Sequence, residues 1–216
     1  MVTCLNFRLT EKVKAASFVG ATLGEINVYP IIEEELKKME DGGILIIDLA
    51  WKERVLDYRF FFTSIAPLLK KLPDYGNKYI IIKIGSVGQR MNVLQGITYY
   101  AKGEISNNER VLLKLIEESG YSAIFLPSAN KEKNLEYIGI SDEKLKTIID
   151  VITKKGGITS SELSKEMGIT IEESLSLLQG LHQKRLIYFH ECSDLKEEES
   201  IYQSLNYILR KDFKEV

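Results

Sequence analysis

Apolar and polar positions follow two different periods along the first 140 residues. The runs GILIIDLAW (43–51) and YIIIKI (79–84) carry isoleucine or leucine at both odd and even positions. Strands of this kind are buried on both faces, as in a parallel sheet that other elements cover. We therefore predict that these runs form the centre of a parallel sheet. SAIFLP (122–127) and LEYIGI (135–140) predict its edge strands.

Helical spacing fills the intervals between these strands. Apolar side chains recur every three or four residues in VYPIIEEELKKMED (28–41), where Pro30 suits the first turn. The same spacing predicts further helices at Tyr58–Leu72, Gln89–Ala101 and Asn108–Ser119. Ahead of them, Val2–Leu9 and Ala15–Leu23 predict a β-hairpin. Strands alternating with helices predict an α/β domain over residues 1–140, a three-layer or two-layer sandwich with a mainly parallel central sheet.

A second, smaller pattern begins at Asp142. LKTIIDVITKK (145–155) places its apolar residues on one helical face and ends at two glycines. Two shorter helices follow, and each has a threonine or serine cap with a glutamate at capping-box spacing. The caps are Thr159 or Ser160 for one helix and Thr170 for the next. IYFHE (187–191) and IYQSL (201–205) predict strands on either side of a polar wing, CSDLKEEES (192–200).

This order of elements resembles a winged helix-turn-helix domain over residues 141–207, which implies a small carboxy-terminal domain at 141–216. In that family the third helix enters the major groove of DNA. The resemblance implies DNA contacts from Thr170, Glu172, Ser176, Gln179, Gln183, Lys184 and Arg185, with Lys196 from the wing. It favours a DNA-binding transcriptional regulator. We expect a homodimer, since paired half-sites give small DNA readers their specificity.

Charge favours a different use of the same scaffold. Residues 141–216 hold 11 Lys/Arg and 14 Asp/Glu, whereas residues 1–140 hold 18 and 17. A domain that binds the phosphate backbone normally has a basic excess. Leu175 and Leu177 add apolar side chains to the third helix, and such residues often mark interfaces. The alternative is therefore a protein-interaction adaptor whose winged helix does not bind DNA.

The stretch from Gly24 to Ile84 resembles a STAS or STAS-like domain. In that family a Gly-Glu-led helix precedes a strand that ends in aspartate, and a second aspartate begins the next helix. Asp48, Asp57 and Gly76 stand close to the family's positions. Phospho-switched members carry a serine after the second aspartate, where Tyr58 stands here. This departure argues against a phosphorylation switch and favours Asp57 as a helix N-cap.

The loop IGSVGQRMNVLQGI (84–97) raises the prospect of a ligand. It follows a buried strand and opens a helix, and it resembles the ligand loop of CARF domains, which sense cyclic oligonucleotides. A small anion or nucleotide would meet free backbone N–H groups there. The candidate ligand-binding residues are Gly85, Ser86, Gly88, Gln89 and Arg90. The alternative is a glycine-rich turn with solvated side chains, because a lone Gly-x-x-Gly is a weak motif.

Nothing in the sequence predicts an enzyme. It has two histidines, His182 and His190, and no phosphate loop, complete dinucleotide fingerprint or nucleophile elbow. We expect no cofactor and no metal. Cys4 and Cys192 imply no disulfide framework. No apolar run approaches the roughly 20 residues that span a bilayer, so we expect a cytoplasmic protein without a membrane partner.

Overall fold

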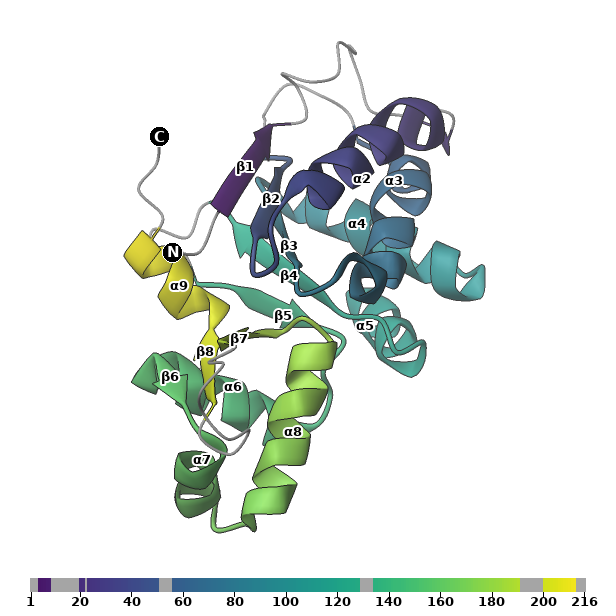
Figure 1. Ribbon diagram of the computed structural model, residues 1–216. Coiled ribbons are helices and arrows are strands. Elements are labelled where there is room, and N and C mark those ends of the chain that lie inside the picture. The colour runs from purple at the N-terminus through teal and green to yellow at the C-terminus, as the bar shows by residue number, and fades with distance from the viewer. Residues whose placement is uncertain are drawn as a thin grey trace. The chain divides into compact units, whose positions relative to one another are not determined.

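The computed structural model describes residues 4–8, 20–21, 23–50, 56–128, 134–190 and 200–212. Its contacts divide the chain into two compact units, one ending at Gly139 and the other beginning at Ile140. Figure 1 shows both units with their elements labelled. Each unit is described by itself below.

A five-stranded sheet forms the amino-terminal unit. Its strands are β1 (Cys4–Arg8), β2 (Ile44–Asp48), β3 (Tyr79–Ile84), β4 (Ala123–Pro127) and β5 (Glu136–Ile138). They lie in the order β1-β2-β3-β4-β5. The first four are parallel to one another, and β5 runs antiparallel to β4. The predicted α/β fold with a mainly parallel sheet is confirmed.

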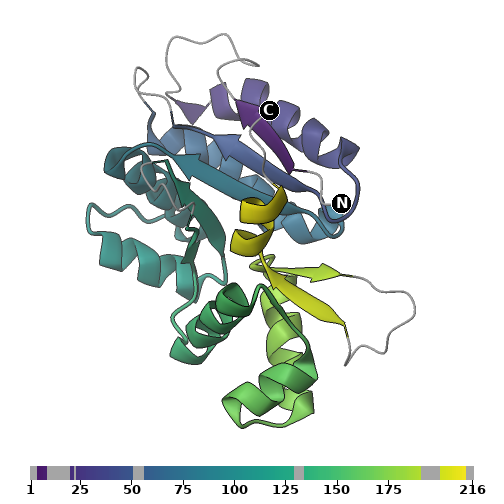
Figure 2. The same ribbon diagram turned by 90° about the vertical axis from the view of Figure 1, so that its left-hand side faces the viewer.

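The helices of this unit cover one face of the sheet, so the unit has one layer of strands and one layer of helices. They are α2 (Tyr29–Lys38), α3 (Tyr58–Lys71), α4 (Val87–Lys102) and α5 (Glu109–Glu118). The unit also contains a short π-helix, η1 (Leu23–Val28), and a 3₁₀ turn, η2 (Leu72–Tyr75). Figure 2 shows the strands in front of α2, α3 and α4. Parallel strands in sequential order require this arrangement, since right-handed crossovers then return on the same side.

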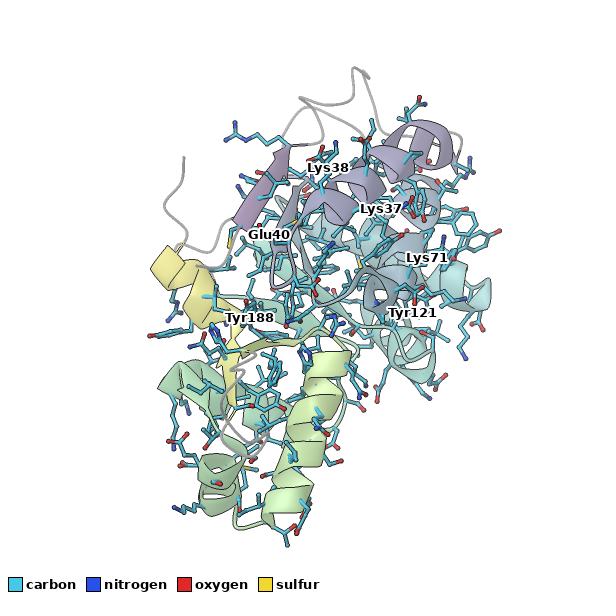
Figure 3. All side chains as sticks on the ribbon, viewed as in Figure 1. Lys37, Lys38, Glu40, Lys71, Tyr121 and Tyr188 are labelled. Atoms are coloured by element: carbon cyan, nitrogen blue, oxygen red, sulfur yellow. The ribbon has the colours of Figure 1, made fainter. Side chains whose placement is uncertain are left out.

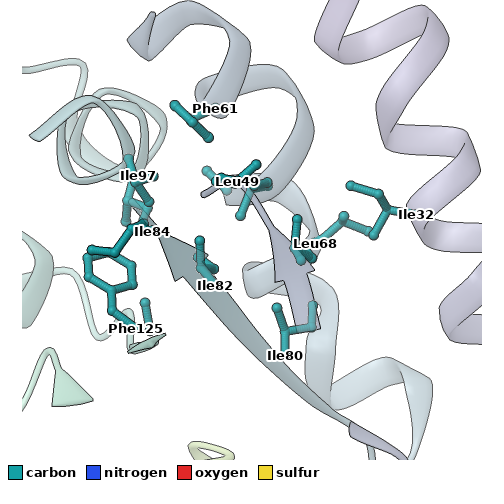
Figure 4. Close-up of a cluster of buried hydrophobic side chains, with 14 of the residues drawn as sticks. Ile32, Leu49, Phe61, Leu68, Ile80, Ile82, Ile84, Ile97 and Phe125 are labelled. Atoms are coloured by element: carbon teal, nitrogen blue, oxygen red, sulfur yellow. The ribbon is translucent and has the colours of Figure 1, made fainter. Parts of the chain in front are cut away.

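One row of apolar side chains crosses four strands beneath these helices. The register places Phe7 beside Ile47, Ile47 beside Ile82, and Ile82 beside Phe125. Figure 4 shows Ile82 and Phe125 of this row with Ile32 and Phe61 from the helices. The strand residues of opposite parity are buried as well, among them Ile44, Ile46 and Ile81. Burial on both parities confirms the reading of these runs as central strands.

The predicted hairpin at the start of the chain is wrong. Cys4–Arg8 is a strand, but it pairs in parallel with β2, so its neighbour lies some 40 residues further along the chain. Of the second predicted strand, residues 15–19 and 22 lie outside the described residues, and Ala21 and Leu23 are helical. β4 also differs from its prediction as an edge strand, because it pairs with both β3 and β5.

Helices α3 and α4 approach closely at Gly96. A methyl group added there would lie 2.5 Å from Cβ of Phe61 and 2.9 Å from both the Phe62 nitrogen and the Tyr58 carbonyl oxygen. Real Cβ atoms essentially never come within 3.0 Å of such neighbours. Gly96 is therefore the position at which the two backbones meet without an intervening side chain.

The carboxylate of Glu33 accepts three hydrogen bonds and links α2 to the turn after α3. Glu33 accepts hydrogen bonds from the hydroxyls of Tyr29 (2.7 Å) and Tyr75 (2.5 Å) and from Nζ of Lys37 (2.8 Å). Lys71 donates in turn to the Tyr29 hydroxyl at 3.0 Å. Figure 3 labels Lys37 and Lys71 among the side chains. The bond from Lys37, followed by those from the two tyrosines, lowers the pKa of Glu33 from 4.5 to about 2.

This lowered pKa predicts an acid-dependent loss of stability. A carboxylate whose pKa is lower in the folded state stabilises the fold fully above its unfolded pKa, here 4.5. That stabilisation is lost as the pH falls from 4.5 towards about 2. We expect Glu33→Gln to lower the melting temperature near neutral pH, and the difference from the native protein to shrink across that window. A difference that stays constant down to the acid limit would contradict the assignment. The matched control is Glu118→Gln.

The carboxy-terminal unit contains helices around a small sheet. Its elements are α6 (Glu143–Lys155), β6 (Gly157–Ile158), α7 (Ser160–Met167), α8 (Ile171–Gln183), β7 (Ile187–His190), β8 (Ile201–Ser204) and α9 (Leu205–Asp212). The strands lie in the order β6-β8-β7 and are antiparallel. Three helices followed by a β-hairpin match the predicted helix-turn-helix with its wing strands.

Local capping chemistry explains where these helices begin. Thr159 and Glu162 form the predicted capping box of α7, in which the hydroxyl accepts from the Glu162 nitrogen at 3.2 Å. Thr170 caps α8 and accepts from the Glu173 nitrogen at 3.1 Å. Such caps stabilise a helix start by about 1 kcal/mol.

Two elements of this unit are absent from the sequence predictions. β6 consists of two residues, Gly157 and Ile158, that pair with β8. α9 continues directly from β8, with Leu205, Ile208 and Leu209 buried. The spacing of these three residues is helical and is the signal that predicts the helix.

Candidate nucleic-acid interface

Helix α8 is fixed in place by its buried side. Leu178 and Leu181 are fully buried. The Ser174 hydroxyl, also buried, donates to the Ser160 carbonyl oxygen at 2.6 Å and thereby joins the starts of α7 and α8. Because both ends of this hydrogen bond are buried, it holds the two helices at a fixed angle to each other. The opposite side of α8 is thus presented at a fixed orientation.

A row of polar side chains lies on that opposite side. Glu172, Ser176 and Gln183 are exposed and Gln179 is half-buried. Positions four, seven and eleven residues apart return to nearly the same direction at about 100° per residue. We call these four residues the α8 row. Three of them are uncharged and can both donate and accept hydrogen bonds, which is the chemistry that base edges present.

The remaining predicted contacts differ in what they can offer. Lys184 is exposed at the end of α8. The Thr170 hydroxyl already serves as the N-cap. Lys196 and wing residues 192–199 lie outside the described residues. Of the predicted contacts, the α8 row lies together on one side of α8, and Lys184 is exposed at the end of the helix.

Arg185 has an unusual backbone conformation. Its φ is +58°, the left-handed region that favours glycine. The Arg185 nitrogen donates to the His182 carbonyl at 2.8 Å and the Leu186 nitrogen to the Leu181 carbonyl at 3.0 Å. This pair of bonds is a Schellman cap. The Arg185 guanidinium donates to the same His182 carbonyl at 3.0 Å, so the side chain is folded back onto the helix end.

The surface around α8 is acidic. Helices α7 and α8 together carry Glu162, Glu166, Glu172 and Glu173, against Lys165. Two of these glutamates pair with lysines of α6: Glu173 with Lys144, and Glu166 with Lys155 at 2.6 Å. Burial, reinforced by the charge of Arg185, lowers the pKa of His182, so this ring adds no positive charge near neutral pH. Any DNA bound here meets few cations.

Several donors of the candidate ligand loop in the amino-terminal unit are engaged within the protein. Ser86 caps α4 and accepts from the Gln89 nitrogen at 3.2 Å, and Gln89 accepts from the Gly85 nitrogen at 2.6 Å. Arg90 pairs with Glu109 and, at 3.1 Å, with Glu136. Gly85, Ser86 and Gly88 are exposed. An anion here would have to compete with two carboxylates for Arg90.

The described residues hold no group of three or more His, Cys, Asp or Glu side chains placed to bind a metal ion. No helix in the described part of the chain has the length and apolar character needed to span a membrane.

Comparison with known proteins bears on the carboxy-terminal unit. Residues 136–216 match the family model of the TFIIE alpha subunit. The match covers α6 to α9 and supports a winged-helix domain of the kind found in transcription factors. Neither curated proteins nor solved structures give a significant match. The resemblance of the amino-terminal unit to STAS-like domains stays a prediction.

Proposed function

We propose that this protein is a non-enzymatic, DNA-binding transcriptional regulator in which α8 reads base edges. The observation that carries the proposal is the α8 row, Glu172, Ser176, Gln179 and Gln183, on the exposed side of a helix fixed by buried contacts. Glutamine is suited to bidentate bonds with adenine, and glutamate accepts from the cytosine amino group. The family match of residues 136–216 supports a role in transcription.

The electrostatics shape the kind of binding we propose. Base contacts specify a site, whereas phosphate contacts supply most of the sequence-independent affinity. With four glutamates and one lysine on α7 and α8, phosphate attraction is weak. The protein is therefore proposed to bind as a homodimer, since two copies add their base contacts across paired half-sites.

Gel-shift assays with genomic fragments at low salt test the reading role. We expect Gln179→Ala combined with Gln183→Ala to weaken binding to a selected fragment at least tenfold, since each good base contact contributes about 1–3 kcal/mol of discrimination. Thr147→Ala, which removes an uncharged polar side chain at an exposed position of α6, is the control. The proposal fails if no fragment is retarded, or if the two glutamines prove dispensable.

The salt dependence of binding gives a second, quantitative expectation. The predicted contacts include three cations, Lys184, Arg185 and Lys196. The logarithm of the binding constant should then fall with the logarithm of salt concentration with a slope no steeper than about −3 per bound copy. Fluorescence anisotropy over a salt series measures this slope. A much steeper slope would place the DNA on another, more basic surface.

The acidic surface also favours the adaptor as a second candidate. Ile171, in the first turn of α8, is 39% exposed beside Glu172 and Glu173. An apolar side chain flanked by carboxylates suits a basic protein partner better than a phosphate backbone. In this case the α8 row contacts a protein partner, and changing the charge of the α8 row does not change the affinity for DNA.

Ligand sensing by the 85–90 loop is a further part of the proposal. The exposed backbone at Gly88 supports it, and the pairing of Arg90 with Glu109 and Glu136 weighs against a strongly anionic ligand. A thermal-shift screen with nucleotides and cyclic oligonucleotides tests it. A hit that Arg90→Ala leaves unchanged would remove the loop from the site.

A further inference from the structure

Helices α3 and α4 carry positive charge and no carboxylate. Within residues 58–71 and 87–102 there are five Lys or Arg residues and no Asp or Glu. These helices belong to a chain whose net charge is −2, so the bias is local. Arg90 is neutralised by Glu109 and Glu136. The exposed cations are Arg59, Lys70, Lys71 and Lys102.

Four aromatic rings line the crossing of the same two helices. Tyr99 makes edge contacts with Tyr58 at 5.7 Å and with Phe62 at 4.9 Å between ring centroids. Phe62 also lies 5.9 Å from Tyr100. We call Tyr58, Phe62, Tyr99 and Tyr100 the aromatic seam. Tyr99 is 37% exposed, and the other three rings are half-buried.

Cations stand at both ends of the aromatic seam. The Arg59 guanidinium lies 5.8 Å from the Tyr58 ring centroid, and Nζ of Lys70 lies 5.8 Å from that of Tyr100. Lys71, labelled in Figure 3, is held to the Tyr29 hydroxyl instead. Cation–π contacts at exposed sites contribute only about 0.5–1 kcal/mol. They leave the charges of Arg59 and Lys70 open to solvent and to a partner.

The carboxylate nearest to α3 in the sequence lies directly before the helix, and its charge acts on Arg59. Asp57, its N-cap, accepts from the Phe60 nitrogen at 3.0 Å and the Gly20 nitrogen at 3.2 Å. Glu104 follows the end of α4. The aromatic seam therefore has cations at its ends and no acid among its own residues, which is complementary to a negatively charged apolar ligand.

We propose that the aromatic seam binds an acidic segment of a protein partner. Carboxylates of the segment pair with Arg59 and Lys70, and an apolar side chain between them packs on the exposed part of Tyr99. A single-stranded nucleic acid fits less well, because base stacking needs open ring faces and a continuous line of cations. Here the rings pack against one another, and Tyr99 is the exposed one. This site lies in the amino-terminal unit and does not rest on the DNA-binding proposal.

Fluorescence anisotropy with the full chain tests the site. The probe is a labelled peptide of glutamates interrupted by phenylalanine, compared with the same peptide carrying lysine in place of glutamate and with a labelled oligothymidine. We expect the acidic peptide alone to bind. Arg59→Glu combined with Lys70→Glu should weaken binding at least tenfold, because both attractive charges become repulsive. Tyr99→Ser should weaken it with both charges intact.

The matched control is Arg110→Glu combined with Lys114→Glu on α5, which makes the same charge change at exposed positions. Melting curves identify variants that do not fold, and Tyr99→Phe serves as the conservative replacement. Equal weakening by both double variants would overturn the proposal, since net charge alone would then explain binding. Absence of binding by the acidic peptide, or tighter binding of oligothymidine, would overturn it too.

Discussion

Replacing Gly96 by alanine should destabilise the amino-terminal unit by about 3 kcal/mol, at the upper end of the range for overpacked interiors. The new methyl group would lie 2.9 Å from the Phe62 nitrogen and the Tyr58 carbonyl oxygen. Those atoms belong to the backbone of α3, so they cannot turn away as a side-chain end would. The two helices would have to separate along their crossing. Urea denaturation followed by circular dichroism measures the change in the free energy of unfolding.

Gly180→Ala is the matched control, because it makes the same substitution in a helix where the new methyl group meets no atom within 4 Å. Alanine in an open helical position should stabilise by about 0.5–1 kcal/mol. The expected effects therefore have opposite signs. If Gly96→Ala is neutral or stabilising, the close crossing of α3 and α4 is wrong, and with it the geometry of the aromatic seam.

Replacing Glu172 by lysine should raise the affinity for DNA of unrelated sequence about tenfold at low salt, if α8 faces the duplex. On a fragment where Glu172 contacts cytosine, the same change also removes that base contact. The change removes a carboxylate from the presented side of the helix and puts a cation within reach of phosphate. A lysine in the first turn opposes the helix dipole, at a cost of about 0.3–1 kcal/mol in stability. A variant that is less stable but binds DNA more tightly cannot be explained by general destabilisation, which would weaken binding. Anisotropy titrations and melting curves on the same preparation give both quantities.

The control for this variant is Glu118→Lys on α5, an equal charge change in the other unit at a side chain that is 48% exposed. A gain with Glu172→Lys alone supports DNA at α8. Equal gains from both variants mean that DNA responds only to net charge. No gain from either variant favours the adaptor, in which α8 contacts protein.

The sequence by itself determined the elements whose causes are local. Isoleucine or leucine at both odd and even positions indicated β2 and β3, and the helical spacing of apolar residues indicated α2 to α8. Side-chain caps also act over three residues, so Asp57, Thr159 and Thr170 were identifiable as helix starts from their own neighbours. The same local pattern carried the winged helix, which the family match of residues 136–216 supports.

Tertiary structure decided the features that depend on residues distant in sequence. The sequence predicts a strand at Cys4–Arg8, but its parallel partner is β2, which lies far along the chain and not in the segment that follows directly. The sequence predicts that Arg90 binds an anionic ligand, but in the folded unit Arg90 pairs with Glu109 and Glu136. The aromatic seam likewise needs α3 and α4 to cross at Gly96. The physical reason is that hydrogen-bond caps and periodicity act within a turn or two of chain, whereas pairing partners and ion pairs are fixed only when the core closes.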